Sequence, residues 1–228
     1  MGIGDYVGSS FNYAKEALVG KWVRWILLLI CTIIQGITLC IIPLLNGYIV
    51  RIFAGPEEAP EVDSWGKLFV DGWKLNIIAI VYFIVPAIVA LIIFLLSAGA
   101  SGGILSLFDV TNTGADIGML FATLGISFIV FIILAIIFGL FAIIGMVRFA
   151  RTEKMGAAFA FSDIAAHIGK IGWGKYIIAL IVLWIIIGII EFVLMLIPII
   201  GGIILFIIAP LLAIWAARYY SQLYDAGL

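Results

Sequence analysis

Long apolar runs are the feature that most restricts how this chain folds. Residues Ile117–Val147 hold thirty-one consecutive positions without Asp, Glu, Lys or Arg, and as a helix this run is about 46 Å long. Leu75–Leu96 and Ile203–Ala217 are also free of charge, and Tyr176–Ile197 contains one charged residue, Glu191. Because a helix of about twenty apolar residues crosses the hydrocarbon core of a bilayer, these four runs predict membrane-spanning helices, with a loop over residues 97–116.

The overall composition supports the same class. The chain has 228 residues, of which 66% are hydrophobic and 11% are charged, whereas soluble domains have about 45–50% apolar and about 25% charged residues. The sequence therefore predicts an all-α, polytopic transmembrane helical bundle that forms one membrane domain over residues 1–228. Asp5, Lys15 and Glu16 in the first twenty residues argue against a signal peptide, and the net charge of -1 argues against nucleic-acid binding.

The first apolar run, Ile26–Val50, allows two interpretations. As one helix it is about 37 Å long. As a hairpin that turns near Gln35 and Gly36, each half reaches only about 18–20 Å and is short or re-entrant. The hairpin gives about six membrane helices in total, and the single helix gives five spans with the N-terminus outside.

The distribution of basic residues favours the hairpin. All twelve Lys and Arg residues lie in four segments: the N-terminus through Arg24, Arg51–Lys74, Arg148–Lys175, and Arg218. The positive-inside rule places such segments in the cytoplasm, which requires an even number of crossings before Arg51. We therefore expect a multi-pass protein of the cytoplasmic membrane with both termini in the cytoplasm.

A short pattern occurs three times along the chain. Ten positions separate Asn12 from Trp22, Asp63 from Trp73 and Asp163 from Trp173, and each pair brackets a glycine that precedes the tryptophan. Each segment combines polar and apolar residues, as interfacial amphipathic helices do, and a long apolar run follows. The pattern predicts three repeats over approximately residues 10–51, 62–148 and 162–218, each an interfacial helix followed by an outgoing and a returning helix.

Interfacial side chains form the first group of candidate site residues. An arginine ends each expected returning helix, where it complements the helix dipole and reaches lipid phosphates, and tryptophans mark the boundary of the bilayer. Membrane lipids are the expected partners, with a second copy or another membrane protein as further possibilities. The candidate headgroup and interfacial residues are Arg51, Arg148, Arg218, Trp22, Trp65, Trp73 and Trp173.

Polar residues inside the apolar runs form the second group. Glu191 lies within the run Tyr176–Ile197, and an ionisable residue in a membrane span is by default a functional candidate. Gln35 and Asn46 lie in the first run, where we expect them to satisfy backbone groups freed by the turn. The segment Gly55–Glu61, with two prolines and three glutamates, predicts a solvated turn.

No motif for catalysis, metal binding or cofactor binding is present. The sole histidine, His167, has no Cys or second His nearby, so neither a metal nor a cofactor is expected. The leading hypothesis is a non-enzymatic module that interacts with lipid, organises the membrane or assists another membrane protein. The alternative is a small transporter or channel with a polar site near Glu191.

The stretch Asn46–Lys74 resembles a prokaryotic family of membrane proteins common in archaea, the domain-of-unknown-function family 4013. The resemblance is carried by Gly47-Tyr48-x-x-Arg51, by the Trp65-Gly-x-Leu-Phe-x-x-Gly72 element, and by residues 145–148 and 217–220. It extends distantly to the membrane domain of some glycerophosphodiester phosphodiesterases. This resemblance implies a multi-helix membrane module near lipid chemistry and gives no catalytic residues to transfer.

Overall fold

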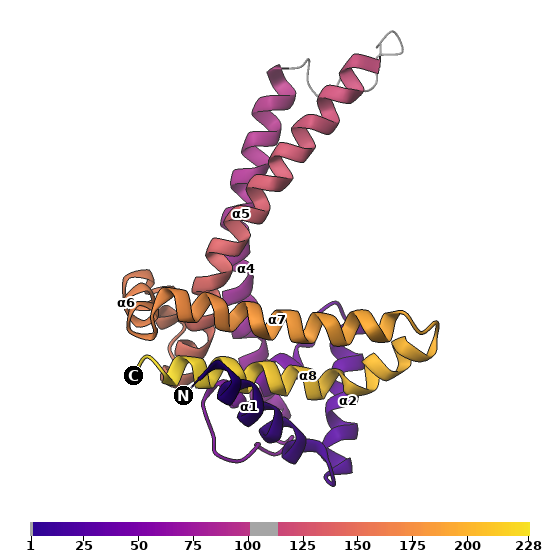
Figure 1. Cartoon of the computed structure of the whole chain (residues 1–228), viewed down its shortest axis with the longest axis vertical. Helices are drawn as coiled ribbons and strands as arrows, with labels where there is room; N and C mark the ends of the chain where they lie inside the picture. Colours follow the sequence, from indigo (N-terminus) through magenta and orange to yellow (C-terminus); the bar gives the residue numbers. More distant parts are fainter. Residues whose placement is uncertain (1, 101–113) are drawn as a thin grey trace. The chain divides into compact units, whose positions relative to one another are not determined.

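A computed structural model describes residues 2–100 and 114–228 of the chain (Figure 1). In this part of the chain the structure is helical and contains no strand, which confirms the all-α fold class. The helices are α1 (Ile3–Leu18), α2 (Trp22–Ile37), α3 (Leu44–Phe53), α4 (Trp65–Ala100), α5 (Gly114–Thr152), the short 3-10 helix η2 (Met155–Phe159), α6 (Phe161–Ile171), α7 (Trp173–Met195) and α8 (Ile200–Asp225).

Four of these helices, α4, α5, α7 and α8, are long and apolar enough to cross a membrane. The α1–α2 pair, bent by 101°, has the composition of a broken span or a re-entrant loop, and α3 is a shorter apolar helix. The chain is thus a polytopic membrane protein, as its apolar runs predict. The expected loop at 97–116 lies largely outside the described residues; at its edges α4 continues to Ala100 and α5 begins at Gly114.

The chain forms two compact units, residues 1–78 with 143–228, and residues 79–142. The second unit consists of the distal parts of α4 and α5. In the first unit, α7 and α8 run side by side and α1 packs along α8 (Figure 1). The Trp25 indole of α2 donates a hydrogen bond to the Ile207 carbonyl oxygen at 2.9 Å, so α2 also contacts α8.

The first apolar run forms two helices, as the hairpin interpretation predicts, and not one continuous helix. The break lies at residues 38–43, where Leu39 and Cys40 have positive φ angles of 49° and 64°. The expected turn at Gln35 and Gly36 is wrong by several residues, because both belong to the last turn of α2. The Gln35 side chain reaches across the break to α3, as described below.

The repeated pattern corresponds to similar local structure in its first and third copies. Gly20 separates α1 from α2 with φ 80°, and Gly172 separates α6 from α7 with φ 93°. This left-handed conformation is available to glycine without steric cost, so each amphipathic helix ends there and an apolar helix begins at Trp22 or Trp173.

The second copy differs from the prediction of a separate interfacial helix. α4 runs without a break from Trp65 through Gly72 into its apolar stretch, and Gly72 serves close packing instead. A Cβ at Gly72 would overlap the Pro43 carbonyl oxygen, and a Cβ at Gly47 would overlap the Leu68 carbonyl oxygen. α3 and α4 therefore cross with their backbones in contact, which small residues allow. The organisation of the whole chain into three repeats stays a prediction.

Candidate functional site: a charged pocket beside the 54–64 loop

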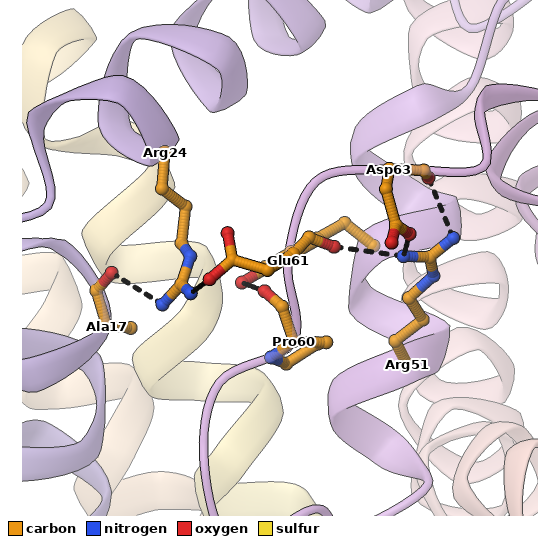
Figure 2. A network of polar contacts seen from close by, with 7 residues as sticks. Ala17, Arg24, Arg51, Pro60, Glu61 and Asp63 are labelled. Atoms are coloured by element: carbon orange, nitrogen blue, oxygen red, sulfur yellow. Dashed lines mark hydrogen bonds and ion pairs between the residues drawn. The ribbon is translucent and has the colours of Figure 1, made fainter.

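The loop of residues 54–64 connects α3 to α4 and is held by arginines from three helices. Arg24 of α2 is 5% exposed; its Nη2 forms an ion pair with the Glu61 carboxylate, and its Nη1 donates to the Ala17 carbonyl oxygen at 3.1 Å. Figure 2 shows this guanidinium between α1 and the loop. Because a buried charge needs both a partner and hydrogen bonds, Arg24 fixes Glu61 in position.

Arg51 holds the same loop from α3. Its Nη1 donates to the Glu61 carbonyl oxygen at 2.9 Å and to Asp63 Oδ1 at 2.7 Å, and its Nη2 donates to the Asp63 carbonyl oxygen at 2.9 Å (Figure 2). Hydrogen bonding from the Arg51 guanidinium holds the pKa of Asp63 below its usual value. The guanidinium of this predicted headgroup residue thus has three bonds within the protein.

Arg218 of α8 reaches the start of the loop. Its Nη1 donates to the Pro56 carbonyl oxygen at 2.8 Å, and its guanidinium carbon lies 4.5 Å from the centre of the Tyr13 ring, a cation–π arrangement. Gly55 has φ 82° and lies so close to the Arg151 guanidinium that a Cβ would overlap it. The segment predicted as a solvated turn is therefore a fixed loop, although its Glu57 and Glu58 side chains are exposed.

A pocket of about 180 Å³ lies beside this loop and is lined by charged groups from α3, from α4 and from the residue that follows α5. It is lined by Val50, Arg51, Ala54, Lys67, Asp71, Lys74, Phe149, Ala150 and Glu153. Lys74 Nζ lies 3.0 Å from Asp71 Oδ1, and Lys67 Nζ lies 3.7 Å from Glu153 Oε1. Three cations and two carboxylates thus face one cavity that contains both donors and acceptors.

The pocket lies where the apolar stretches begin and end. Lys67, Asp71 and Lys74 recur at steps of four and three residues, so they share one face of α4, and the uncharged stretch of α4 starts at Leu75. Glu153 directly follows the last residue of α5. This is the level at which the headgroups of a bilayer meet a spanning helix.

The other predicted interfacial residues do not line the charged pocket. Arg148 Nη2 pairs with Asp163 Oδ2 of α6 at 2.5 Å. Trp22 is 64% exposed and stacks on Trp25 at 5.7 Å between ring centres. Trp65 and Trp173 are also exposed, whereas Trp73 is half-buried. The structure brings only Arg51 of the predicted set into the charged pocket; Lys67, Asp71, Lys74 and Glu153 were missed, although the spacing on α4 was visible in the sequence.

Gln35 and Asn46 form a polar network at the base of the first hairpin. Gln35 Nε2 donates to Asn46 Oδ1 at 3.1 Å, and Gln35 Oε1 accepts from the Asn46 backbone N–H at 3.1 Å. Asn46 Nδ2 then donates to Asn76 Oδ1 at 2.6 Å, and Asn76 Nδ2 donates to the Cys40 carbonyl oxygen at 3.0 Å. Gln35 satisfies a backbone group next to the turn, as we expect from the sequence. The Asn46 side chain bonds to side chains instead, and Asn76 of α4 satisfies the carbonyl oxygen of Cys40.

Glu191 lies apart from this network, in a groove between α7 and α8. The structure does not bring it together with Gln35 or Asn46. His167 is buried on α6, where its Nε2 lies 2.8 Å from the Tyr224 carbonyl oxygen and its ring stacks on Tyr224 at 4.2 Å. Within residues 2–100 and 114–228, no group of three or more His, Cys, Asp or Glu side chains is placed to hold a metal ion.

Comparison with known proteins gives one match. A family model described as "Protein of unknown function (DUF4013)" matches residues 30–199, which contain the polar network and all residues that line the charged pocket. No curated protein and no solved structure matches the chain, and these comparisons give the more distant likeness to glycerophosphodiester phosphodiesterases no support.

Proposed function

The chain belongs to the DUF4013 family of proteins of unknown function, and we propose that it is a non-enzymatic membrane module that binds lipid headgroups in its charged pocket. The observation that carries this proposal is the convergence of Arg51, Lys67 and Lys74 on one cavity at the level where the α4 apolar stretch begins. Cations at this level attract lipid phosphates.

The carboxylates of the pocket suit the rest of a headgroup. Asp71 is 8% exposed and lies in the same lining as Glu153, so a hydroxyl or ammonium group attached to the phosphate meets acceptors. We therefore propose a phosphate-bearing headgroup with a donor group, bound with its acyl chains along the apolar surface of α4. The positive-inside rule places this pocket in the cytoplasmic leaflet.

The transporter alternative receives less support from the groove beside Glu191. Its other lining residues are apolar: Ile187, Met195, Leu205, Ala209, Leu212, Ala213 and Ala216. A path for an ion or a polar solute needs several polar groups in sequence. The lining offers one.

Titration of the delipidated protein in detergent with dioctanoyl phosphatidylglycerol tests the proposal, with thermal unfolding as the readout. We expect saturable stabilisation, because a ligand that binds only the folded state raises its stability, and a Kd about tenfold weaker in Lys67→Ala/Lys74→Ala. The matched control is Lys15→Ala/Lys170→Ala, which removes the same two charges from exposed positions of α1 and α6. Equal weakening in both double variants means general attraction to the anionic lipid and contradicts the proposal.

A further inference from the structure

The α7–α8 hairpin leaves a groove of about 590 Å³ that is separate from the charged pocket. α7 contributes Ile187, Glu191 and Met195 at steps of four residues, so these side chains form one row along the helix. α8 contributes the remaining lining residues, Leu205, Ala209, Leu212, Ala213 and Ala216. Both helices are long and apolar enough to cross a membrane, so the groove runs along two membrane-spanning helices.

Glu191 is the only charged side chain in this lining, and it is exposed. No hydrogen bond or ion pair joins its carboxylate to any other residue that the structure describes. Ionisable groups within membrane spans almost always pair with another group because an unpaired charge in hydrocarbon is costly. The described chain does not supply that partner, and a cation is the group of complementary charge.

The α8 wall of the groove has small side chains that let another helix come close. Ala209, Ala213 and Ala216 of α8 lie at steps of four and three residues, on one face of the helix. Small residues with this spacing let the backbone of a second helix pack closely in a membrane. Leu205 and Ala216 at the ends of the α8 wall are about 16 Å apart along the helix axis, or about three helical turns of contact.

The α7–α8 hairpin of a second copy in the same orientation does not provide the cation. All twelve Lys and Arg residues lie in the four basic segments, and on α7 the nearest of them, Lys175, is sixteen residues from Glu191, about 24 Å along the helix. Glu191, one turn before α7 ends at Met195, therefore has no basic side chain of α7 at its level.

We propose that the α7–α8 groove docks a transmembrane helix of a different membrane protein, and that a Lys or Arg near one end of that helix pairs with Glu191. Van der Waals contact with the alanine row holds the helix, and the ion pair selects it. This interaction is independent of the headgroup pocket, which lies between other helices.

A designed peptide tests the proposal in phosphatidylcholine vesicles. The peptide is a single-span Leu/Ala helix with one Lys about one turn from its end and a dansyl group that accepts energy from the tryptophans of the protein. A second peptide carries Leu in place of Lys. We expect the protein to bind the Lys peptide at least about fivefold more tightly than the Leu peptide, that is by about 1 kcal/mol.

Two variants and a control separate the parts of the interaction. Glu191→Gln removes the preference for Lys, and Ala213→Leu weakens binding of both peptides because it fills the groove. Ala87→Leu makes the same change at an exposed position of α4 and leaves both affinities unchanged. Equal binding of the two peptides by the unmodified protein, or a preference that survives Glu191→Gln, overturns the proposal.

Other occupants have distinct outcomes in the same vesicles. Displacement of the Lys peptide by phosphatidylethanolamine assigns the groove to an amine-bearing lipid. A dimer that the Lys peptide does not dissociate assigns it to a second copy of the chain. Either result overturns docking of a partner helix and leaves the headgroup titration of the charged pocket unaffected.

Discussion

The first hairpin of the chain, α2–α3, and the last, α7–α8, differ in whether their polar side chains have partners. Both follow a left-handed glycine and a tryptophan, at Gly20 and Trp22 and at Gly172 and Trp173. In α2–α3 the side-chain amides bond to one another and to the backbone of the turn. In α7–α8 the one charged side chain of the groove, Glu191, has no partner in the described residues. The polar groups of the first hairpin are thus satisfied within the chain, whereas the last hairpin keeps a polar group available.

Backbone contact gives the largest expected difference between the hairpins. Gly72→Ala places a Cβ against the Pro43 carbonyl oxygen, and because backbone atoms cannot move aside easily, we expect a loss of about 3 kcal/mol. Gly188 of α7 has no atom within 4 Å of an added Cβ. Gly188→Ala is therefore neutral or stabilising by up to about 1 kcal/mol, through helix propensity. Thermal unfolding in detergent measures the stability of both variants. Equal losses in the two variants contradict the view that only Gly72 is required for close backbone contact.

The polar groups themselves give the next largest effect. Asn46→Leu leaves the Gln35 and Asn76 side chains without their partner, and we expect a loss of about 2 kcal/mol in unfolding free energy. Glu191→Gln changes no contact within the described chain and should alter stability by no more than about 0.5 kcal/mol. A large loss from Glu191→Gln in the isolated protein contradicts the view that this carboxylate is held for a partner.

The smallest effect is a difference in acid sensitivity. Burial lowers the pKa of His167 from its usual 6.5, so the unfolded state binds its proton first as pH falls. The contribution of neutral His167 is complete above about pH 6.5 and is lost as pH falls through the lowered pKa. His167→Gln should flatten the dependence of the unfolding temperature on pH in that range.

The ion pair between Arg51 of α3 and Asp63 of the following loop is lost only in stronger acid. Arg51 lowers the pKa of Asp63 below 3.8, so the stabilisation by ionised Asp63 is present above about pH 4 and is lost below it. Asp63→Asn should therefore change the pH profile only in that lower range. An effect of Asp63→Asn near pH 6 contradicts the assignment of the two acid transitions.

The sequence predicted the long helices because apolar length alone identifies a membrane span. It also predicted that Ile26–Val50 forms two helices, since the positions of the basic residues favour a hairpin, and it identified Gln35 as a partner of the backbone next to the turn. It misplaced the turn and missed Asn76, which lies thirty residues from Asn46, because hydrogen bonds between distant residues leave no periodic pattern. For the same reason the sequence did not predict that Lys67, Lys74 and Glu153 line one pocket.

Membrane insertion and helical class are thus determined by the sequence by itself, because burial of apolar side chains in lipid depends on local composition. Tertiary structure alone decided that the arginines at helix ends hold the 54–64 loop, that Gly72 packs against Pro43 and does not end a helix, and that Glu191 lies in a groove without a partner. Each of these depends on which backbone or side-chain group of a distant segment comes within contact distance, and local composition does not encode that distance.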